Sequence, residues 1–304
     1  MELSFLALLA ALSAAICQTA TDLGSKAATR EADDRAILLA QWGLSAIVLI
    51  AVTLVSYPEL VSTPAVIWPK LIKPGFWPLL FWDSAINIVS YLFYIRAFRL
   101  ADASLVAPLT LLTPVLMLIT SPIMLGEQTP LLGVGGVVFT VLGVGLLDAG
   151  KTNQSGGRQR LDFRLFIADP GARAMTATAA LWSIGANIDK LGVLASSPLI
   201  WIASVTICIA LFCLIYWLAG PRPPVTPHAL RYAFFAGASM CIGNTVQMWA
   251  LTVLFAPYVI AIKRLSALFT VLVSGRFLQE DTGGRVFGAL VMLLGSMMIA
   301  LARG

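Results

Sequence analysis

The sequence predicts an all-α integral membrane protein in which ten transmembrane helices form two inverted five-helix repeats. Three observations lead to this fold class. Of the 304 residues, 59% are hydrophobic and 12% are charged, whereas roughly 25% are charged in an average soluble domain. The apolar runs are continuous and about 17–25 residues long, as helical membrane spans require. The second half of the chain also repeats residues of the first half at a constant spacing.

Ten apolar runs, separated by more polar segments, are the predicted spans. Each must be helical because the bilayer core contains no water to hydrogen-bond an open backbone. The first run is predicted to be a retained helix rather than a secretory signal, because Glu2 precedes it and no basic residue does. The spans cover residues 3–21, 36–55, 77–97, 103–125, 131–147, 175–190, 199–218, 230–251, 256–277 and 286–302.

Proline and glycine distinguish particular spans. Each proline inside a helix removes a backbone donor, so Pro108, Pro114 and Pro122 predict a kink or an unwound turn in the fourth span. The ninth span has only Pro257, at its start. The fifth and tenth spans are rich in glycine, which allows close packing and predicts a scaffold contact or a homodimer contact.

An internal repeat relates the two halves. Residues 97–129 align with residues 250–282 at a constant offset of 153 positions, which pairs Glu127 with Glu280. Each unit contains five spans, an odd number, so the second copy enters the membrane from the opposite side. The repeat is therefore predicted to be inverted, an arrangement that places a shared cavity near the middle of the bilayer.

The ends of the fourth and ninth spans carry related acidic motifs, LGEQTP at residues 125–130 and LQEDTG at residues 278–283. Together with the chain length and the repeat, these motifs resemble the drug/metabolite transporter superfamily, in particular its EamA-like family. The resemblance covers essentially the whole chain. It implies two EamA-like five-helix repeats, residues 1–150 and 172–304, joined by a polar linker at 151–171. It also implies transport of small metabolites, without identifying the metabolite.

Polar side chains form one face of the third span and of the eighth. In the third span they recur at i, i+4, i+8 and i+11, which is one side of a helix. The face comprises Asp83, Asn87, Tyr91 and Tyr94, and the eighth span adds Asn244 and Gln247. We interpret both faces as cavity walls, with Asp83 as the preferred site for a coupling ion. Interhelical hydrogen bonding is the alternative.

Lys263 and Arg264, the Lys-Arg pair, lie well inside the ninth span. An ionisable group at such a depth costs roughly 2.5–3.5 kcal/mol on insertion scales, so the pair predicts substrate binding. Arginine and lysine together suit a carboxylate or a phosphate. Ser266 on the same span, and Thr110 and Thr113 on the fourth, are further candidate substrate-binding residues.

The Lys-Arg pair also resembles the ninth-helix pair of plastid sugar-phosphate translocators of the same superfamily. Those carriers add a lysine from the fourth helix, whereas this chain has Thr110 at the position equivalent to Lys263. That difference argues against a sugar-phosphate substrate.

The negative charge that balances the Lys-Arg pair has two candidate sources in the sequence. If the substrate supplies it, the substrate is an anion, such as an organic or phosphorylated acid. If Asp22, Asp83 or Asp189 supplies it, the cavity is neutral and suits a zwitterion such as an amino acid. Asp22 lies near the predicted end of the first span, four residues before Lys26, and a local ion pair is expected between them.

The sequence thus predicts a secondary transporter that moves a small polar metabolite by alternating access. It is expected to be a multi-pass protein of a cell membrane, a bacterial inner membrane. Its predicted partners are a small-molecule substrate and the lipid bilayer. The net charge of +5 does not indicate nucleic acid, because the chain has no polar domain to present a basic surface. The positive-inside rule places both termini outside, whereas the resemblance implies both inside.

An enzyme is not expected. His228 is the single histidine of the chain, and neither metal-ligand spacing nor a Ser–His or Cys–His arrangement is evident. Neither a cofactor nor a metal is therefore predicted. A lipid-phosphate flippase is the closest alternative function, because the Lys-Arg pair suits a phosphate headgroup. A membrane enzyme is a more distant one.

Overall fold

The computed structural model describes residues 2–126, 131–146, 168–221, 224–253, 256–280, 282 and 285–301. Within these ranges every regular element is an α-helix. The helices are α1 (Glu2–Ala28), α2 (Asp34–Ser56), α3 (Glu59–Ser62), α4 (Pro64–Leu71), α5 (Phe76–Leu100), α6 (Ala103–Leu109), α7 (Leu112–Leu125), α8 (Leu131–Leu146), α10 (Pro170–Ala195), α11 (Pro198–Leu218), α12 (Pro227–Val253), α13 (Ala256–Lys263), α14 (Leu265–Phe277) and α15 (Arg285–Leu301).

These helices lie where the apolar runs predicted them, with ends that differ by several residues. Among the described residues, four helical segments are long and apolar enough to cross a membrane by length and composition. They are Asp34–Ser56, Phe76–Leu100, Ala103–Leu125 and Pro198–Leu218. The chain is accordingly an all-α membrane protein.

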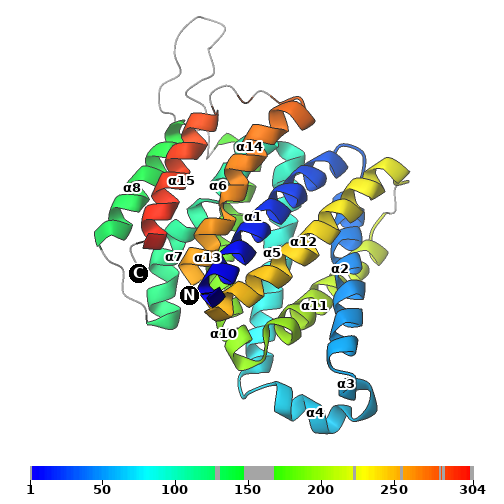
Figure 1. Ribbon diagram of the computed structural model, residues 1–304. Helices are drawn as coiled ribbons and strands as arrows, with labels where there is room; N and C mark the ends of the chain where they lie inside the picture. Colours follow the sequence, from blue (N-terminus) through cyan, green and yellow to red (C-terminus); the bar gives the residue numbers. More distant parts are fainter. Residues whose placement is uncertain are drawn as a thin grey trace, which may run out of the picture.

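The short helices α3 and α4, which no apolar run predicted, connect α2 to α5 at the lower end of the molecule in Figure 1.

Two of the long helical segments are interrupted near their middle. The first is the predicted break in the fourth span: α6 ends at Leu109 and α7 begins at Leu112, with Pro108 just before the gap. The second lies between α13 and α14, at Arg264. No proline marks that second break, so the proline pattern did not predict it. The two breaks are equivalent in the repeat, since Leu111 and Arg264 are 153 positions apart.

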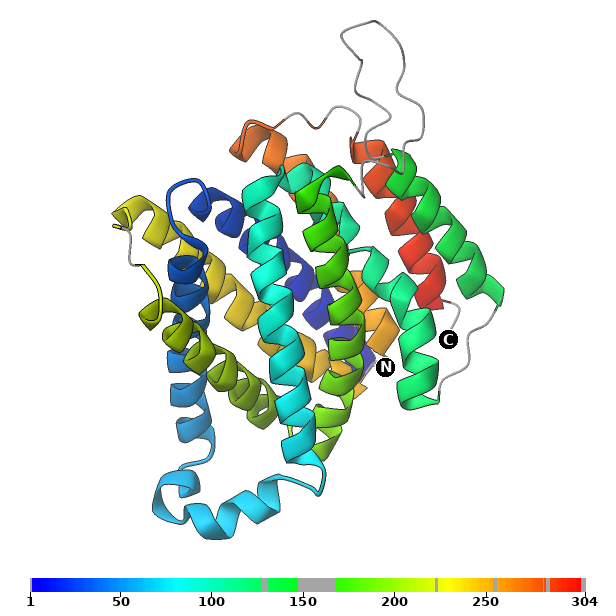
Figure 2. The same cartoon turned by 180° about the vertical axis from the view of Figure 1, so that it is seen from behind.

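The helices pack in pairs from different halves of the chain. α1 runs along α12, α5 along α10, α2 along α11 and α8 along α15; Figures 1 and 2 show α8 and α15 side by side at one edge. The glycine-rich helices α8 and α15 therefore pack on each other within one chain. A Cβ atom on Gly143 would lie 2.5 Å from the backbone nitrogen of Met292, so glycine is needed for this approach.

Polar contacts join the two halves at one end of the bundle, which we call the Glu280 end. It lies at the top of Figure 1. The carboxylate of Glu280 accepts hydrogen bonds from the backbone nitrogens of Ala103 and Ser104, both at 2.9 Å. Arg285 donates to Asp102 Oδ2 at 3.1 Å and to the Ser104 hydroxyl. Contacts from the second half thus hold the N-terminus of α6.

Two predictions fall outside the described residues. Glu127, the repeat equivalent of Glu280, is one of them. The other is most of the predicted polar linker, residues 151–167.

Candidate functional site

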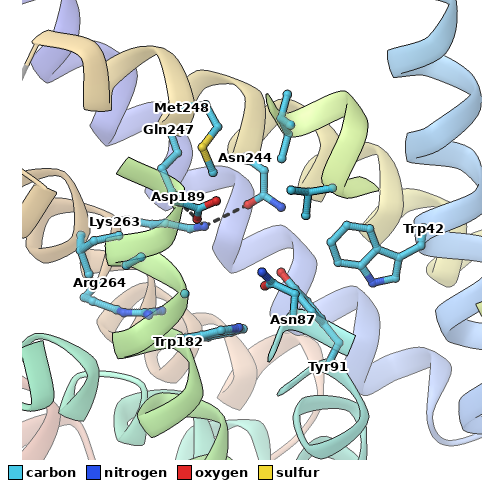
Figure 3. Close-up of a pocket in the computed structure, with 15 residues that line it drawn as sticks. Trp42, Asn87, Tyr91, Trp182, Asp189, Asn244, Gln247, Met248, Lys263 and Arg264 are labelled. Carbon is cyan, nitrogen blue, oxygen red and sulfur yellow. Dashed lines mark hydrogen bonds between the residues drawn. The ribbon is translucent and has the colours of Figure 1, made fainter. Parts of the chain in front are cut away.

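A polar cavity of about 60 Å³ lies between helices of both halves. Its walls come from α2, α5, α10, α11, α12 and α13, together with Arg264 at the break that follows α13. Figure 3 shows the side chains that point into it. The polar and aromatic lining residues are Trp42, Asn87, Tyr91, Trp182, Asp189, Asn244, Gln247, Lys263 and Arg264.

Six of the predicted site residues line this cavity, and five do not. The six are Asn87, Tyr91, Asn244, Gln247, Lys263 and Arg264. Asp83, Tyr94, Thr110, Thr113 and Ser266 are absent from its lining. The fourth span contributes no lining residue, although Thr110 and Thr113 were predicted to bind the substrate. The second, sixth and seventh spans do contribute, through residues such as Trp42, Trp182, Asp189 and Val205.

Lys263 is held by neutral partners. Its ammonium group donates to Gln247 Oε1 at 2.6 Å and to Asn244 Oδ1 at 3.1 Å. These are the two polar residues that the eighth span was predicted to place toward the cavity. Figure 3 shows the Asp189 carboxylate near this ammonium group, and the two side chains interact electrostatically. Asp189 Oδ1 in turn accepts a hydrogen bond of 2.8 Å from the indole of Trp201.

Arg264 extends to the opposite side, toward the first half. Its Nη2 donates to Thr113 Oγ1 at 3.0 Å, and its guanidinium carbon lies 4.9 Å from the ring centre of Trp182, a cation–π contact. Its Nε is buried and has no hydrogen-bond partner among the described residues. The ion pairs found within the described ranges include neither Lys263 nor Arg264. The cavity therefore contains cationic donors that are only partly satisfied.

The predicted ion pair between Asp22 and Lys26 is wrong. It forms no ion pair with Lys26, whose ammonium group donates to two backbone carbonyls at the end of α5. Its carboxylate is buried and accepts bonds from Tyr94 at 2.6 Å, Gln18 at 2.8 Å and Thr270 at 3.1 Å. The prediction failed because α1 continues to residue 28, which leaves Asp22 inside the helix rather than near an interface. Asp22 thus joins α1, α5 and α14.

The other predicted residues that are absent from the cavity lining are buried. Asp83 is fully buried, and its Oδ2 accepts a bond of 3.0 Å from Asn87, which does line the cavity. The Thr110 hydroxyl bonds to the backbone oxygen of Ala107 at the break in the fourth span. The buried Ser266 accepts a bond from Thr19 on its backbone oxygen.

The single histidine lies on the surface, at the Glu280 end. Its Nδ1 is 3.2 Å from Glu31 Oε1, and the Thr226 hydroxyl donates to Glu31 Oε2 at 2.7 Å. These bonds stabilise the carboxylate, so Thr226 and His228 lower the pKa of Glu31. Within the described residues, no group of three or more histidine, cysteine, aspartate or glutamate side chains is placed to hold a metal ion.

Together, the fold and the cavity define a multi-pass α-helical membrane protein with a charged central site. Residues 5–147 match the model of the EamA-like transporter family, which is the family that the acidic motifs and the repeat predicted.

None of the curated proteins matches the chain, whereas 27 chains of solved structures do. One of them is a crystal structure that is similar with a TM-score of 0.62 and 17% sequence identity. The similarity covers 99% of this chain and 96% of the chain in that structure. At that identity the likeness shows the fold alone.

Proposed function

We propose that this protein is a secondary transporter that moves a small zwitterionic metabolite, such as an amino acid, across a bacterial inner membrane by alternating access. The cavity carries the proposal, because its lining contains Lys263 and Arg264 together with Asp189 and so provides both signs of charge. A carboxylate would bind the partly satisfied cationic donors, and an ammonium group would bind Asp189. A plain anion would bind the cationic donors but would give Asp189 no ammonium partner.

Two features support an inverted repeat. Exchanging the halves turns the α1–α12 pair into the α10–α5 pair, and both pairs are closely packed. The same exchange superposes the two helix breaks, at Leu111 and Arg264. Inverted repeats allow one half to rock against the other around a fixed central site, which is the geometry of alternating access.

The size of the cavity supports movement of its walls. At about 60 Å³ it has room for only a few water molecules. A solute must therefore separate the helices that enclose it. At the Glu280 end, bonds from Glu280 and Arg285 hold the two halves together. We infer that these bonds form when that end is closed and break when it opens.

Thermal unfolding of the purified protein tests the substrate class. The probes are the L-amino acids, each compared with the amine and the carboxylic acid that retain only one of its charges. We expect at least one amino acid to raise the unfolding temperature, and neither single-charge analogue to do so at equal concentration. A solute at 100 times its Kd stabilises the folded state by about 2.7 kcal/mol.

Matched variants identify the binding groups. Lys263→Ala, Arg264→Ala and Asp189→Asn should abolish this stabilisation while the folded fraction stays unchanged. Lys70→Ala, on the exposed surface of α4, should retain it. Stabilisation by the carboxylic acids or by inorganic phosphate alone would contradict a zwitterion and support an anion carrier. Movement of labelled phospholipid between the leaflets of liposomes would support a flippase instead.

A further inference from the structure

Asp83 is a buried carboxyl group outside the cavity lining. Its exposed fraction is 0%, and its Oδ1 has no hydrogen-bond partner among the described residues. Its Oδ2 accepts a single side-chain bond, from Asn87. The ion pairs between described residues do not include it. An ionised carboxylate in such a place costs several kcal/mol, and a bound proton removes that cost.

The charges at the centre of the bundle lead to the same conclusion. Two cations, Lys263 and Arg264, lie among three carboxyl groups, those of Asp22, Asp83 and Asp189. Asp22 accepts three hydrogen bonds and interacts electrostatically with Arg264. Asp189 interacts with Lys263. Lys263 also interacts with Asp22, so both cations have anionic neighbours among Asp22 and Asp189, and Asp83 is the carboxyl group left without a cation.

The helices that pack against α5 bring one charged group that acts on Asp83, namely Asp189 of α10. Neither α6 nor α11 contains a charged residue. Lys190 follows Asp189 directly and so lies about 100° further round α10. The remaining charged residues on neighbouring helices are Arg173 near the start of α10, Asp34 and Arg35 in the first turn of α2, Glu2 at the start of α1, and Asp22 and Lys26 of α1 with the partners given above.

We propose that Asp83 and Asp189 form a proton-binding carboxylate pair, in which Asp83 holds the proton while the cavity is empty of solute. The negative charge of Asp189 disfavours a second negative charge on Asp83. A solute ammonium group bound at Asp189 cancels that repulsion, so the O–H bond of Asp83 breaks and its proton passes to water in the cavity. Asn87 remains as a donor to the carboxylate that forms.

Thermodynamic linkage between solute binding and proton binding gives the direction in which each affects the other. Since solute binding weakens proton binding, proton binding must weaken solute binding by the same factor. Solute and proton therefore occupy the site alternately, and the carrier exchanges one for the other. This coupling step rests on the proposed zwitterionic substrate, whereas the proton on Asp83 does not.

Infrared spectroscopy tests whether Asp83 holds a proton, and the test needs no solute. Wild-type protein at neutral pH should show the C=O stretching band of a carboxylic acid, and labelling of aspartate with ¹³C should shift it. The band should be absent in Asp83→Asn and present in Asp22→Asn. It should weaken in Asp189→Asn, because the charge that disfavours ionisation of Asp83 is gone. No aspartic acid band in the wild type, or a band that survives in Asp83→Asn, would overturn the proposal. If Asp83→Asn does not fold, Asp83→Glu takes its place. The band of labelled aspartic acid should be lost in that variant, and its persistence would overturn the proposal.

Proton release tests the coupling. Addition of the L-amino acids to wild-type protein in weakly buffered solution should release up to one proton per solute bound, and Asp83→Asn should bind without release. Binding to the wild type without release would overturn the exchange. If no amino acid binds, the proposed substrate class fails, while the infrared band still decides whether Asp83 holds a proton.

Discussion

Removal of the Glu280 carboxylate should loosen the start of α6. Glu280 comes from the segment after α14 and accepts hydrogen bonds from the first two backbone nitrogens of α6, both at 2.9 Å. Nitrogens at a helix N-terminus have no partner within the helix, and the helix dipole adds to the attraction of an anion there. The bonds therefore join the second half of the chain to the first.

The size of the effect follows from these two bonds. Loss of a capping side chain costs about 0.5–2 kcal/mol, and a hydrogen bond to a charged group contributes about 1.5–3 kcal/mol. Water replaces part of this interaction, so we expect Glu280→Ala to destabilise the closed end by about 1–2 kcal/mol. A change of that size corresponds to a factor of about 5–30 in the equilibrium between closed and open forms.

Hydrogen exchange measures this equilibrium locally, because backbone amides exchange when their segment opens. The amides of Ala103–Leu109 should exchange about 5–30 times faster in Glu280→Ala than in the wild type. Glu280→Gln keeps an acceptor oxygen but loses the charge, so it should show a smaller increase. Glu59→Ala, which removes an exposed carboxylate on α3, is the control. Unchanged exchange in Glu280→Ala would refute a closing role for Glu280.

Three further substitutions have expected outcomes. Gly192→Ala would place a Cβ atom against the buried Trp201 ring, so thermal unfolding should show a destabilisation of about 1–3 kcal/mol, as overpacking does. Gly143→Val should separate α8 from α15 and lower the unfolding temperature, and an unchanged value would argue against their close packing. Glu31→Gln removes a carboxylate whose pKa is lowered by Thr226. It should therefore lower the unfolding temperature at neutral pH, and the difference from wild type should vanish as acid protonates Glu31.

Sequence patterns predicted the helices because membrane spans depend on local composition. A continuous apolar run must satisfy its backbone internally, and this requirement fixes a helix without reference to tertiary contacts. The same reasoning found Lys263, because a charge in an apolar run is costly and conspicuous. Repeat alignment then related the faces of the third and eighth spans, and the structure has Asn244 and Gln247 bonded to Lys263.

Long-range contacts account for what sequence patterns missed. Asp22 and Tyr94 are 72 positions apart, and Asp22 and Thr270 are 248 apart, so no local spacing could reveal their bonds. Trp42 and Trp182 are aromatic residues within apolar runs, where nothing local distinguishes a cavity wall from a lipid-facing side chain. The break at Arg264 lacks a proline, which is the local signal that predicted the break in the fourth span.

Uptake into liposomes tests the central proposal, a zwitterion carrier, most directly. Purified wild-type protein is reconstituted beside Asp189→Asn and the surface control Lys70→Ala, and uptake of labelled L-amino acids is followed. We expect the wild type and Lys70→Ala to take up at least one amino acid, and Asp189→Asn to lose that uptake while remaining folded. Absence of uptake in the wild type, or undiminished amino-acid uptake in Asp189→Asn, would contradict a carrier that binds a zwitterion between Asp189 and the Lys-Arg pair.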